Sequence, residues 1–371
     1  MHMTAPDERV RRVNPLRKLL ARPEFGALAG AVLIFSLFAL TAGSSGMFSM
    51  EGFNNWGTVA AYLGVLAVGA ALLMIAGEFD LSVGSMVGIV GMVLAVPCLY
   101  WGWPVWLALL FAFAAALALG GLNGWLVVKT GLPSFIVTLA FFFILRGLAL
   151  ALSVLLTGKT IVSSNGDLVL QDLMSADPFF STLFQGHAFK GLYNQWAAWG
   201  WMAARDDGMA LAIGLPKSIL WWALLTVIGA FVLAKTTFGN WVLAVGGDAN
   251  AAKNVGIPVA KVKVLLFMVM AFCSALFAVL QVADAGSAAA DRGLQKEFEA
   301  IIAAVIGGCL LTGGYGSVLG AALGALIFGM VQIGIGYTSI DNNWYRVFLG
   351  GMLLAAVLFN NFIRRKVANS R

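Results

Sequence analysis

The stretch GGDANAAKNVGIP, residues 246–258, separates two apolar runs that are each long enough to cross a lipid bilayer. It carries the start and stop signals of one short helix, because Asp248 can cap its N-terminus and Gly256 can adopt the left-handed conformation after its last turn. Pro258 prevents the helix from continuing. Nucleation is costly, so a helix of about two turns is marginal without packing. We therefore expect it to pack either on its own chain or on another subunit.

The composition around this stretch is that of a membrane protein. Of the 371 residues, 61% are hydrophobic and 11% are charged, and the mean hydropathy is +0.91. A chain this apolar cannot cover itself with a water-compatible surface. The three cysteines lie in apolar runs without a CxxC or Cys/His spacing, so neither a disulfide framework nor a metal site is predicted. The first 25 residues are polar and basic and lack the pattern of a cleavable signal peptide.

Runs of about 17 to 25 apolar residues predict the membrane-spanning helices. Ten such runs occur, at residues 26–42, 57–76, 83–100, 104–128, 133–156, 218–235, 263–283, 300–314, 316–337 and 343–362. The sequence therefore predicts an all-α, polytopic membrane protein with about ten transmembrane helices. Its transmembrane domain, 26–362, follows a basic N-terminal tail, 1–25, and precedes a short C-terminal tail, 363–371.

The distribution of Lys and Arg predicts the orientation, because cytoplasmic segments near span ends carry the excess of these residues. An internal N-terminus puts most of the 23 Lys and Arg residues on the cytoplasmic side, in both tails and in the segment 236–262. Both termini are therefore predicted to be cytoplasmic, and the segment 157–217 external. The net charge of +6 is then a topology signal and no indication of nucleic acid. The tryptophan-rich external segment is either an interfacial loop with aromatic anchors or a docking surface for an external protein.

Four blocks of sequence occur in the order found in one known family. They are GEFDLSVGS at 77–85, LPSFIVTLAFFFILRG at 132–147, the pattern AxGGDxxAAxxxGIPVxxxK at 244–263, and EFEAIIAAVIGGCLLTGGYGSVLGA at 297–321. Together they resemble the permeases of bacterial ribose- and xylose-type ABC importers, over nearly the whole chain. The external segment is longer than in simple ribose permeases.

The resemblance implies partners and a coupling site. In that family the cytoplasmic loop holds a coupling helix that sits in a groove of the ATPase subunit. The residues that carry this role over are Gly246, Gly247, Asp248, Asn250, Ala251, Ala252, Gly256 and Ile257. The implied partners are a cytoplasmic ABC ATPase, an external sugar-binding protein and a second permease subunit, taken as an identical copy. No cofactor is expected on this chain, because ATP and Mg belong to the ATPase.

The block at 77–85 contains a pair of carboxylates, Glu78 and Asp80. Such a pair indicates either proton or metal chemistry, or an interfacial loop in which Asp80 caps the next helix near Ser82 and Val83. The stretches 81–91 and 313–324 also resemble each other, with Gly84 and Gly316 in matching positions. They predict a parallel internal repeat whose small residues let helices approach closely.

Scattered polar residues are candidates for a sugar pathway. Asp80 and Ser82 belong to the permease core, and Asn123, Thr138, Ser274, Gln281 and Gln332 lie in predicted spans, where they either line the pathway or bond neighbouring helices. Arg146 is the basic residue well inside a span, about 20 Å from its cytoplasmic start. We predict that it pairs with Glu299 and braces the outer mouth; a direct sugar contact is the alternative.

Missing motifs exclude other classes. The stretch SVLLTGKT, 153–160, ends like a nucleotide-binding loop, but Ser153 replaces the first glycine and the stretch closes a membrane helix. The sequence therefore predicts no ATP hydrolysis by this chain and no enzyme activity. The resemblance implies a permease of the bacterial inner membrane that moves a sugar, in particular a monosaccharide, by alternating access. A permease for another small solute such as a branched-chain amino acid, or an ion-coupled secondary transporter, are the alternatives.

Overall fold

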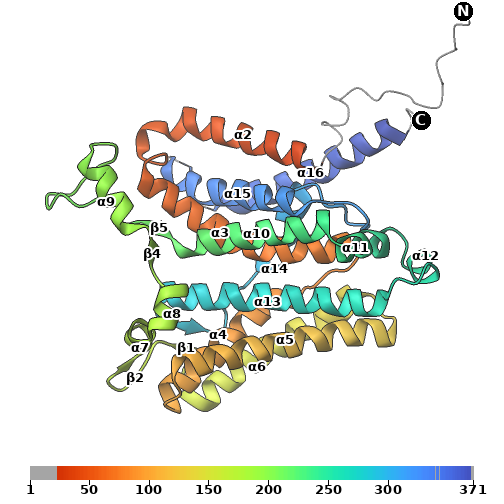
Figure 1. Cartoon of the computed structure of the whole chain (residues 1–371), viewed down its shortest axis with the longest axis horizontal. Helices are drawn as coiled ribbons and strands as arrows, with labels where there is room; N and C mark the ends of the chain where they lie inside the picture. The colour runs from red at the N-terminus through yellow and green to blue at the C-terminus, as the bar shows by residue number, and fades with distance from the viewer. Residues whose placement is uncertain (1–22, 339, 342, 369–371) are drawn as a thin grey trace, which may run out of the picture.

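The structure, a computed structural model, describes residues 23–338, 340–341 and 343–368. Within these residues, eight helices are long and apolar enough to cross a membrane. They are α2 (Pro23–Ala42), α3 (Met50–Ile75), α4 (Val83–Tyr100), α5 (Val105–Thr130), α6 (Ser134–Thr157), α10 (Lys217–Lys235), α13 (Val259–Ala285) and α15 (Val318–Gly334). They run side by side along the long axis of the molecule (Figure 1). The predicted all-helical membrane fold is thus confirmed, with fewer spans than the ten expected.

The predicted span at 300–314 is wrong. The helix there, α14 (Lys296–Ile306), has 11 residues and a length of about 16 Å, whereas the hydrocarbon core is about 30 Å thick. It ends at Gly307, and the chain then forms a loop in which Gly308, Gly313 and Gly314 have positive φ angles. Glycine has no polar side chain, and the apolar residues Cys309, Leu310 and Leu311 lie between these glycines, so the stretch has the hydropathy of a span although it forms a loop and not a helix.

The predicted span at 343–362 falls on α16 (Trp344–Ala368), a helix of 25 residues. Its apolar part within the described residues, Trp344–Ala355, is shorter than a span. Most of the two predicted tails, residues 1–22 and 369–371, lies outside the described residues. The orientation of the termini stays a prediction.

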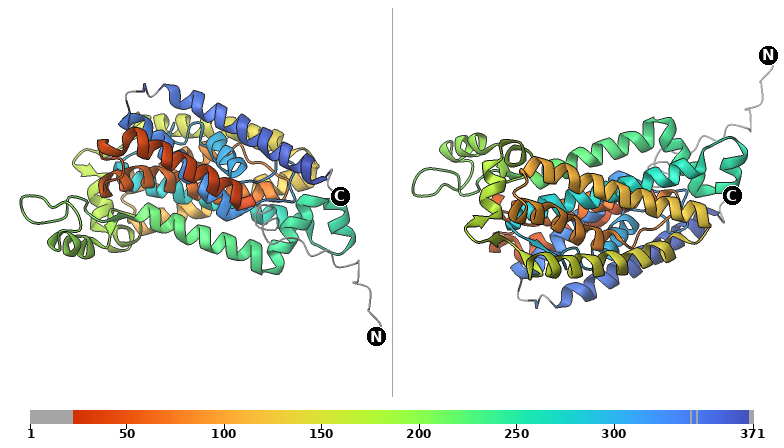
Figure 2. Two further views of the ribbon diagram at one scale, coloured as in Figure 1. Left: turned by 90° about the horizontal axis from the view of Figure 1, so that it is seen from above. Right: turned by 90° about the horizontal axis from the view of Figure 1, so that it is seen from below.

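Helix α3 occupies the centre of the bundle, where α10, α13, α14 and α15 pack around it. It is mostly buried, as is α4, whereas most residues of α2, α5, α6 and α10 are not buried. An exposed apolar helix face is the surface that a lipid bilayer covers. The core is therefore formed by the inner helices, and the outer ones present a lipid-facing surface on the views of Figure 2.

A re-entrant segment, residues 286–307, takes the place of the missing span. It begins after α13, pairs through β6 (Ala288–Ala289) with β1 (Ile161–Val162), and continues into α14. Glycines spaced by four residues make room for it on both sides. On α4, a Cβ at Gly84 would lie 2.2 Å from the Gly293 carbonyl oxygen, and on α15 a Cβ at Gly324 would lie 2.0 Å from that of Ala303. Small residues in a membrane protein let backbones approach in this way.

The same arrangement bears on the predicted repeat. Both α4 and α15 begin after a serine, run toward the same end of the bundle and turn glycines to the re-entrant segment. These shared features agree with a parallel relation, and a common origin of the two stretches stays a prediction.

The long segment between α6 and α10 forms the end of the molecule opposite to residues 246–258 (Figure 1). It contains, in order, β1, β2 (Ser164–Asn165), β3 (Leu168–Val169), α7 (Leu170–Ala176), α8 (Pro178–Leu183), β4 (His187–Ala188), α9 (Lys190–Ala198) and β5 (Leu215–Pro216). Its strands pair locally, β2 with β3 and β4 with β5. Helix α9 projects from the bundle and has a small apolar cluster of its own around Tyr193 and Ala197.

Candidate functional site

Residues 246–258 contain the short helix that the sequence predicts. It is α12 (Ala249–Asn254), and the Asp248 carboxylate accepts hydrogen bonds from the backbone N–H groups of Asn250 (2.8 Å) and Ala251 (3.0 Å). Gly256 follows with a φ of +87°. The N–H of Gly256 donates to the Lys253 carbonyl and that of Ile257 to the Ala252 carbonyl, each at 3.0 Å. This pair of bonds is the Schellman C-cap, so both predicted ends of the helix are confirmed.

Helix α12 is covered by its own chain on one side only. Ala252 is buried, with 3% of its surface exposed, whereas Asn250, Ala251 and Lys253 are exposed. Val255, at the end of the helix, exposes 77% of its surface. An isolated helix of this length needs packing on its open side. The chain itself therefore covers α12 only at Ala252. The rest of α12 is open to another molecule.

A cluster of glycines lies where α12 joins the bundle. The preceding helix, α11 (Thr237–Gly247), ends against the C-terminus of α3 and against the loop before α15. A Cβ at Gly246 would lie 1.7 Å from the Ile75 carbonyl oxygen, which itself accepts a hydrogen bond of 2.8 Å from the Gly314 N–H. Gly77 and Gly313 complete the cluster, since a Cβ at Gly313 would lie 2.8 Å from the Gly77 Cα. We call Gly77, Gly246, Gly313 and Gly314 the glycine junction.

The loop between α3 and α4 holds the predicted core residues Asp80 and Ser82. The Asp80 carboxylate accepts hydrogen bonds from the Ser82 N–H (2.8 Å) and hydroxyl (2.6 Å), and Asn123 on α5 donates to the same hydroxyl (3.0 Å). Burial raises the pKa of Asp80 to about 6, although the hydrogen bonds from Ser82 lower it. Asp80 therefore positions the start of α4, as one of the two interpretations predicted.

The backbone of the same loop is satisfied by side chains of α6. The Ser134 hydroxyl accepts from the Phe79 N–H, and the Thr138 hydroxyl accepts from the Leu81 N–H, both at 3.0 Å. Irregular backbone within a membrane protein requires such partners, because no bulk water is available. The second carboxylate of the motif, Glu78, forms an ion pair with Lys263 on α13. Among the described residues, no group of three or more His, Cys, Asp or Glu side chains is placed to hold a metal ion.

The predicted pair of Arg146 and Glu299 is not formed. Arg146 donates to the Ala290 carbonyl oxygen (3.2 Å) on the re-entrant segment, and Glu299 pairs with Lys296 one helical turn before it. Glu297, which is 2% exposed, is the carboxylate within electrostatic reach of Arg146. The prediction placed α14 at the start of a full span at the outer surface. In the structure its N-terminus begins only after ten residues of re-entrant chain, so a different carboxylate faces the arginine.

The remaining polar candidates are placed as follows, and their role in a sugar pathway stays a prediction. Gln332 on α15 accepts from the Tyr345 hydroxyl (3.4 Å) on α16, and Ser274 donates to the Met270 carbonyl (3.0 Å) of its own helix. Asn123 and Thr138 hold the α3–α4 loop, as described above. None of these four, nor Gln281, lines the cavity at the opposite end of the bundle.

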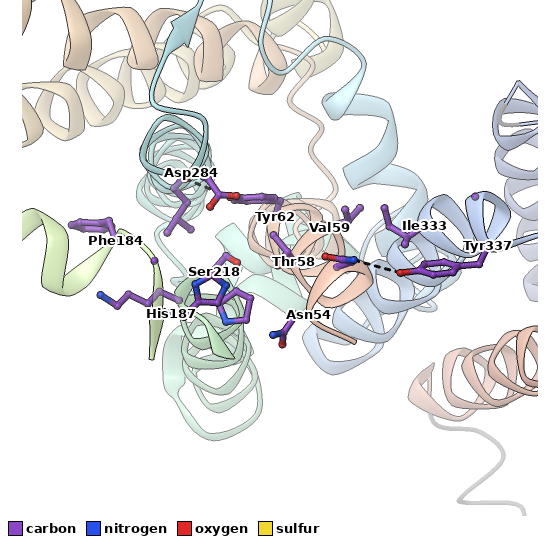
Figure 3. A pocket seen from close by; sticks show the side chains of 16 residues that line it. Asn54, Thr58, Val59, Tyr62, Phe184, His187, Ser218, Asp284, Ile333 and Tyr337 are labelled. Carbon is purple, nitrogen blue, oxygen red and sulfur yellow. Dashed lines mark hydrogen bonds between the residues drawn. The ribbon is translucent and has the colours of Figure 1, made fainter. Parts of the chain in front are cut away.

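That cavity, which we call the outer cavity, has a volume of about 610 Å³ and lies at the end opposite α12 (Figure 3). Polar residues of the first turns of α3 form one wall: Asn54, Asn55, Thr58 and Tyr62. The Tyr62 hydroxyl donates to Asp284 (2.9 Å) at the end of α13. The sequence contained the signal, because polar residues at positions 54, 58 and 62 recur at helical spacing, but the predicted span began only at residue 57.

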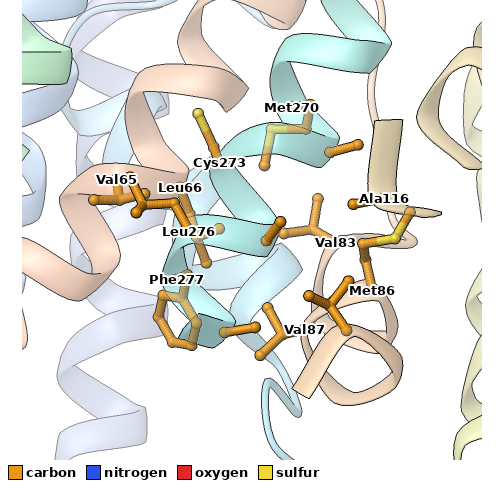
Figure 4. Packing of buried hydrophobic residues seen from close by; sticks show 14 of the residues in the cluster. Val65, Leu66, Val83, Met86, Val87, Ala116, Met270, Cys273, Leu276 and Phe277 are labelled. Atoms are coloured by element: carbon orange, nitrogen blue, oxygen red, sulfur yellow. The ribbon is translucent and has the colours of Figure 1, made fainter. Parts of the chain in front are cut away.

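Below Tyr62 the bundle is closed. Tyr62 packs on Phe277 with ring centroids 5.6 Å apart. Leu66, Leu276 and Phe277 are buried in the core between α3, α4 and α13 (Figure 4). The outer cavity is therefore open at one end of the molecule and separated from the α12 end by packed apolar side chains.

A bundle of apolar helices, a small capped helix exposed at one end and a polar cavity at the other are the features of a membrane transport permease. The chain belongs to the family described as branched-chain amino acid transport system / permease component, whose model matches residues 52–357. It is therefore a transport subunit, and its family is not one of enzymes.

Individual relatives are similar over almost their whole length. The xylose transport system permease protein XylH of Haemophilus influenzae is 30% identical over 366 residues, which cover 91% of this chain and 96% of the relative. The ribose import permease protein RbsC of Haemophilus influenzae is 27% identical, covering 94% and 96%. The inner membrane ABC transporter permease protein YjfF of Escherichia coli is 30% identical, covering 88% and 87%. No solved structure matches the chain.

Proposed function

We propose that this protein is the permease of an ATP-driven ABC importer that carries a monosaccharide across the bacterial inner membrane. The observation that carries the proposal is α12, a capped helix that is open on one side and joined through the glycine junction to the centre of the bundle. The names of the similar proteins, which include a xylose permease, a ribose permease and an inner membrane ABC permease, support the cargo, the driving force and the location.

The partners follow from this role. A cytoplasmic ATPase subunit binds the open side of α12 and holds ATP and Mg. A binding protein delivers the sugar at the opposite end, and a second, identical permease completes the pathway. The coupling residues proposed on this chain are Gly246, Gly247, Asp248, Asn250, Ala251, Ala252, Gly256 and Ile257.

The mechanism is alternating access. ATP binding closes the ATPase subunits and displaces α12. Because Gly246 touches the backbone of Ile75, the displacement passes directly to the end of α3 and to the loop that follows α14. Helix α3 also forms a wall of the outer cavity, so motion at the cytoplasmic end changes the opposite opening. The hydrogen bonds that link Asp80, Ser82 and Asn123 keep the α3–α4 loop fixed during this motion.

Two alternatives are separated by experiment. A branched-chain amino acid as cargo is favoured by the description of the family. An ion-coupled transporter would move its cargo along an ion gradient without ATP. Uptake into proteoliposomes that contain the permease, its ATPase and its binding protein distinguishes all three, because we expect ATP-dependent uptake of a pentose and none of leucine. Uptake that follows an ion gradient in the absence of ATP would contradict the proposal.

Gly256 allows a sharper test of α12. A valine at a φ of +87° is disfavoured by about 1 kcal/mol or more, whereas asparagine tolerates this conformation. A Cβ at this position would meet no atom within 4 Å, so the two substitutions differ only in backbone strain and exposed surface. We expect Gly256→Val to lose sugar-stimulated ATP hydrolysis in the assembled complex and Gly256→Asn to retain it. If sugar stimulates ATP hydrolysis equally in both variants, the C-cap of α12 is not required for coupling to the ATPase.

A further inference from the structure

The outer cavity lies at the end of the molecule away from α12 and has polar groups on several of its walls. Four parts of the chain meet there: the start of α3, the end of α13, the end of α15, and the paired strands β4 and β5, where His187 lies in β4 and Lys217 follows β5. Its volume of about 610 Å³ falls in the range of 300 to 1,000 Å³ found for small-molecule sites. All four parts belong to one copy of the chain.

The wall formed by α3 is a ladder of hydrogen-bonding groups. Asn54, Thr58 and Tyr62 are spaced by four residues, so they follow one side of α3 over about 12 Å of its length. Asn55 lies beside them and donates to the Tyr337 hydroxyl across the cavity (3.4 Å). The Asn54 amide donates to the Gly214 carbonyl (2.8 Å), which fixes the top of this wall. The Thr58 and Tyr62 hydroxyl groups can each donate or accept hydrogen bonds, as a ligand that is rich in hydroxyl groups requires.

Asp284 supplies the acidic group of the cavity. One of its oxygens, Oδ2, accepts from Tyr62, and the residue itself is exposed to the cavity. A carboxylate has more acceptor positions than this single bond uses. Hydrogen bonds to a charged acceptor are about twice as strong as neutral ones, so Asp284 is the strongest acceptor for ligand hydroxyls.

The basic groups of the cavity do not form a matching anion site. Lys217 donates to the Ser181 carbonyl oxygen (2.7 Å), which holds its ammonium group at the wall. Burial lowers the pKa of His187, the charge of Asp284 raises it, and the charges of Lys190 and Lys217 lower it, so that the pKa lies below the ordinary histidine value. The imidazole is therefore neutral near pH 7. The charged groups of the described lining are then one carboxylate, Asp284, and one ammonium group, Lys217. Because these two charges balance, the cavity suits a ligand without net charge.

Apolar and aromatic groups complete the site. Tyr62, which packs on Phe277 beneath it, closes the floor of the cavity. At its side, Phe184 stacks on Trp221 with parallel rings whose centroids are 5.5 Å apart. The Trp221 indole donates to the Leu183 carbonyl (2.9 Å), which fixes this wall. Aromatic faces and a few convergent polar groups are the usual lining of a site for a small polar organic molecule.

We propose that the outer cavity is a binding site for a neutral, polyhydroxylated ligand, a monosaccharide, held within a single copy of this chain by Asp284 and the Asn54–Thr58–Tyr62 face of α3. The inference rests on the proposed function and adds a substrate site to it. It gives the permease an affinity of its own for the sugar, in addition to that of the external binding protein.

The purified permease, without its partners, tests the site. D-Xylose and D-ribose serve as probes, L-leucine as the comparison ligand, and the shift in Tm on titration as the measurement. We expect a pentose to raise the Tm of the native chain and leucine to leave it unchanged. Asp284→Asn and Thr58→Val should each weaken pentose binding roughly tenfold or more, because a ligand hydrogen bond is lost in each.

The matched control is Asp167→Asn, which removes an exposed carboxylate outside the cavity, in the same external segment. It should bind the pentose as the native chain does. Unchanged pentose affinity in both Asp284→Asn and Thr58→Val would overturn the proposal, as would a Tm shift with leucine but not with either pentose.

Transport measurements distinguish this inference from the proposed function. If the assembled complex takes up pentose with ATP and the two cavity variants behave like the native chain, the site is wrong and the importer stands. If the native permease binds pentose but no ATP-dependent uptake occurs with any ATPase partner, the importer is wrong and the site stands.

Discussion

Gly246 occupies a position in which any side chain would strike the backbone of another helix. The carbonyl oxygen of Ile75 lies 1.7 Å from the place of its Cβ, and the N–H of Gly314 lies 2.6 Å from it. Real Cβ atoms do not approach backbone atoms so closely, so a substitution must separate α11 from α3. The next residue, Gly247, has no atom within 4 Å of its Cβ position. Of these two adjacent glycines, only Gly246 is required by a close contact with another helix.

The pair provides a matched prediction. Gly246→Ala forces the glycine junction apart and should cost about 1 to 3 kcal/mol, the usual range for overpacking. Gly247→Ala should be neutral or slightly stabilising, because alanine favours the helix over glycine by up to about 1 kcal/mol. Thermal unfolding of the purified variants measures the difference, and stimulated ATP hydrolysis should fall for Gly246→Ala alone. Similar Tm values for the two variants would contradict the close approach.

At the scale of single residues, the sequence predicts interactions between near neighbours in the chain but not contacts between residues that are far apart in it. The cap by Asp248 and the turn at Gly256 were predicted because both depend on neighbours within a few residues. The reason for Gly246 lies at Ile75 and Gly314, which are far away in the chain. For the same reason the sequence paired Arg146 with Glu299, whereas the fold brings Glu297 near it.

Among the elements, the re-entrant segment shows what hydropathy cannot resolve. The residues of α14 and the following glycine loop are as apolar as those of a span, so a sliding window merges them. A half-helix in a membrane protein is stable only if other helices satisfy the adjoining irregular backbone. Here β1 pairs with residues 288–289, and the Thr160 carbonyl accepts from the Ala290 N–H (3.0 Å). In the eight spans that were predicted correctly, the backbone N–H and C=O groups form their hydrogen bonds within the helix itself.

The α3–α4 loop gives a prediction on pH. Burial raises the pKa of Asp80 to about 6, above its value in the unfolded chain. The folded state therefore binds the proton more tightly, and the stability contributed by protonated Asp80 is fully present below about pH 4 and is lost as the pH rises through 6. Ionisation costs the fold on the order of 2 to 3 kcal/mol. Asp80→Asn keeps an acceptor for Ser82 without the charge.

The measurement compares Tm values from about pH 4 to pH 7. We expect Asp80→Asn to gain stability relative to the native chain as the pH rises, with most of the change complete near pH 6. Asp167→Asn, which changes an exposed carboxylate, should follow the native curve. A constant difference between Asp80→Asn and the native chain over this range would show that Asp80 is ionised throughout.

For the whole molecule, the orientation in the membrane is the prediction with the widest consequences. The three native cysteines, Cys98, Cys273 and Cys309, are free and buried, so they give little background in thiol labelling. The α12 end and the α9 end lie on opposite sides of the bundle (Figure 1). Single cysteines in exposed positions at the two ends, Lys253→Cys and Asp207→Cys, therefore report the orientation.

In spheroplasts, a membrane-impermeant maleimide should label Asp207→Cys at once and Lys253→Cys only after the membrane is permeabilised. The physical reason is the excess of Lys and Arg in the segments on the α12 side. The unsubstituted chain is the control for background. The reverse pattern would place α12 outside the cell and remove the proposed contact with an ATPase.

Helix α3 is buried along most of its length and carries the glycine junction at one end and the ligand face of the outer cavity at the other. A single stiff element that takes part in two equilibria couples their free energies, and thermodynamic linkage makes this coupling reciprocal. If engagement of the ATPase changes the affinity for sugar by some factor, then sugar changes the affinity for the ATPase by the same factor. Sugar bound in the outer cavity therefore changes how tightly the permease holds its ATPase, before any sugar has crossed the membrane.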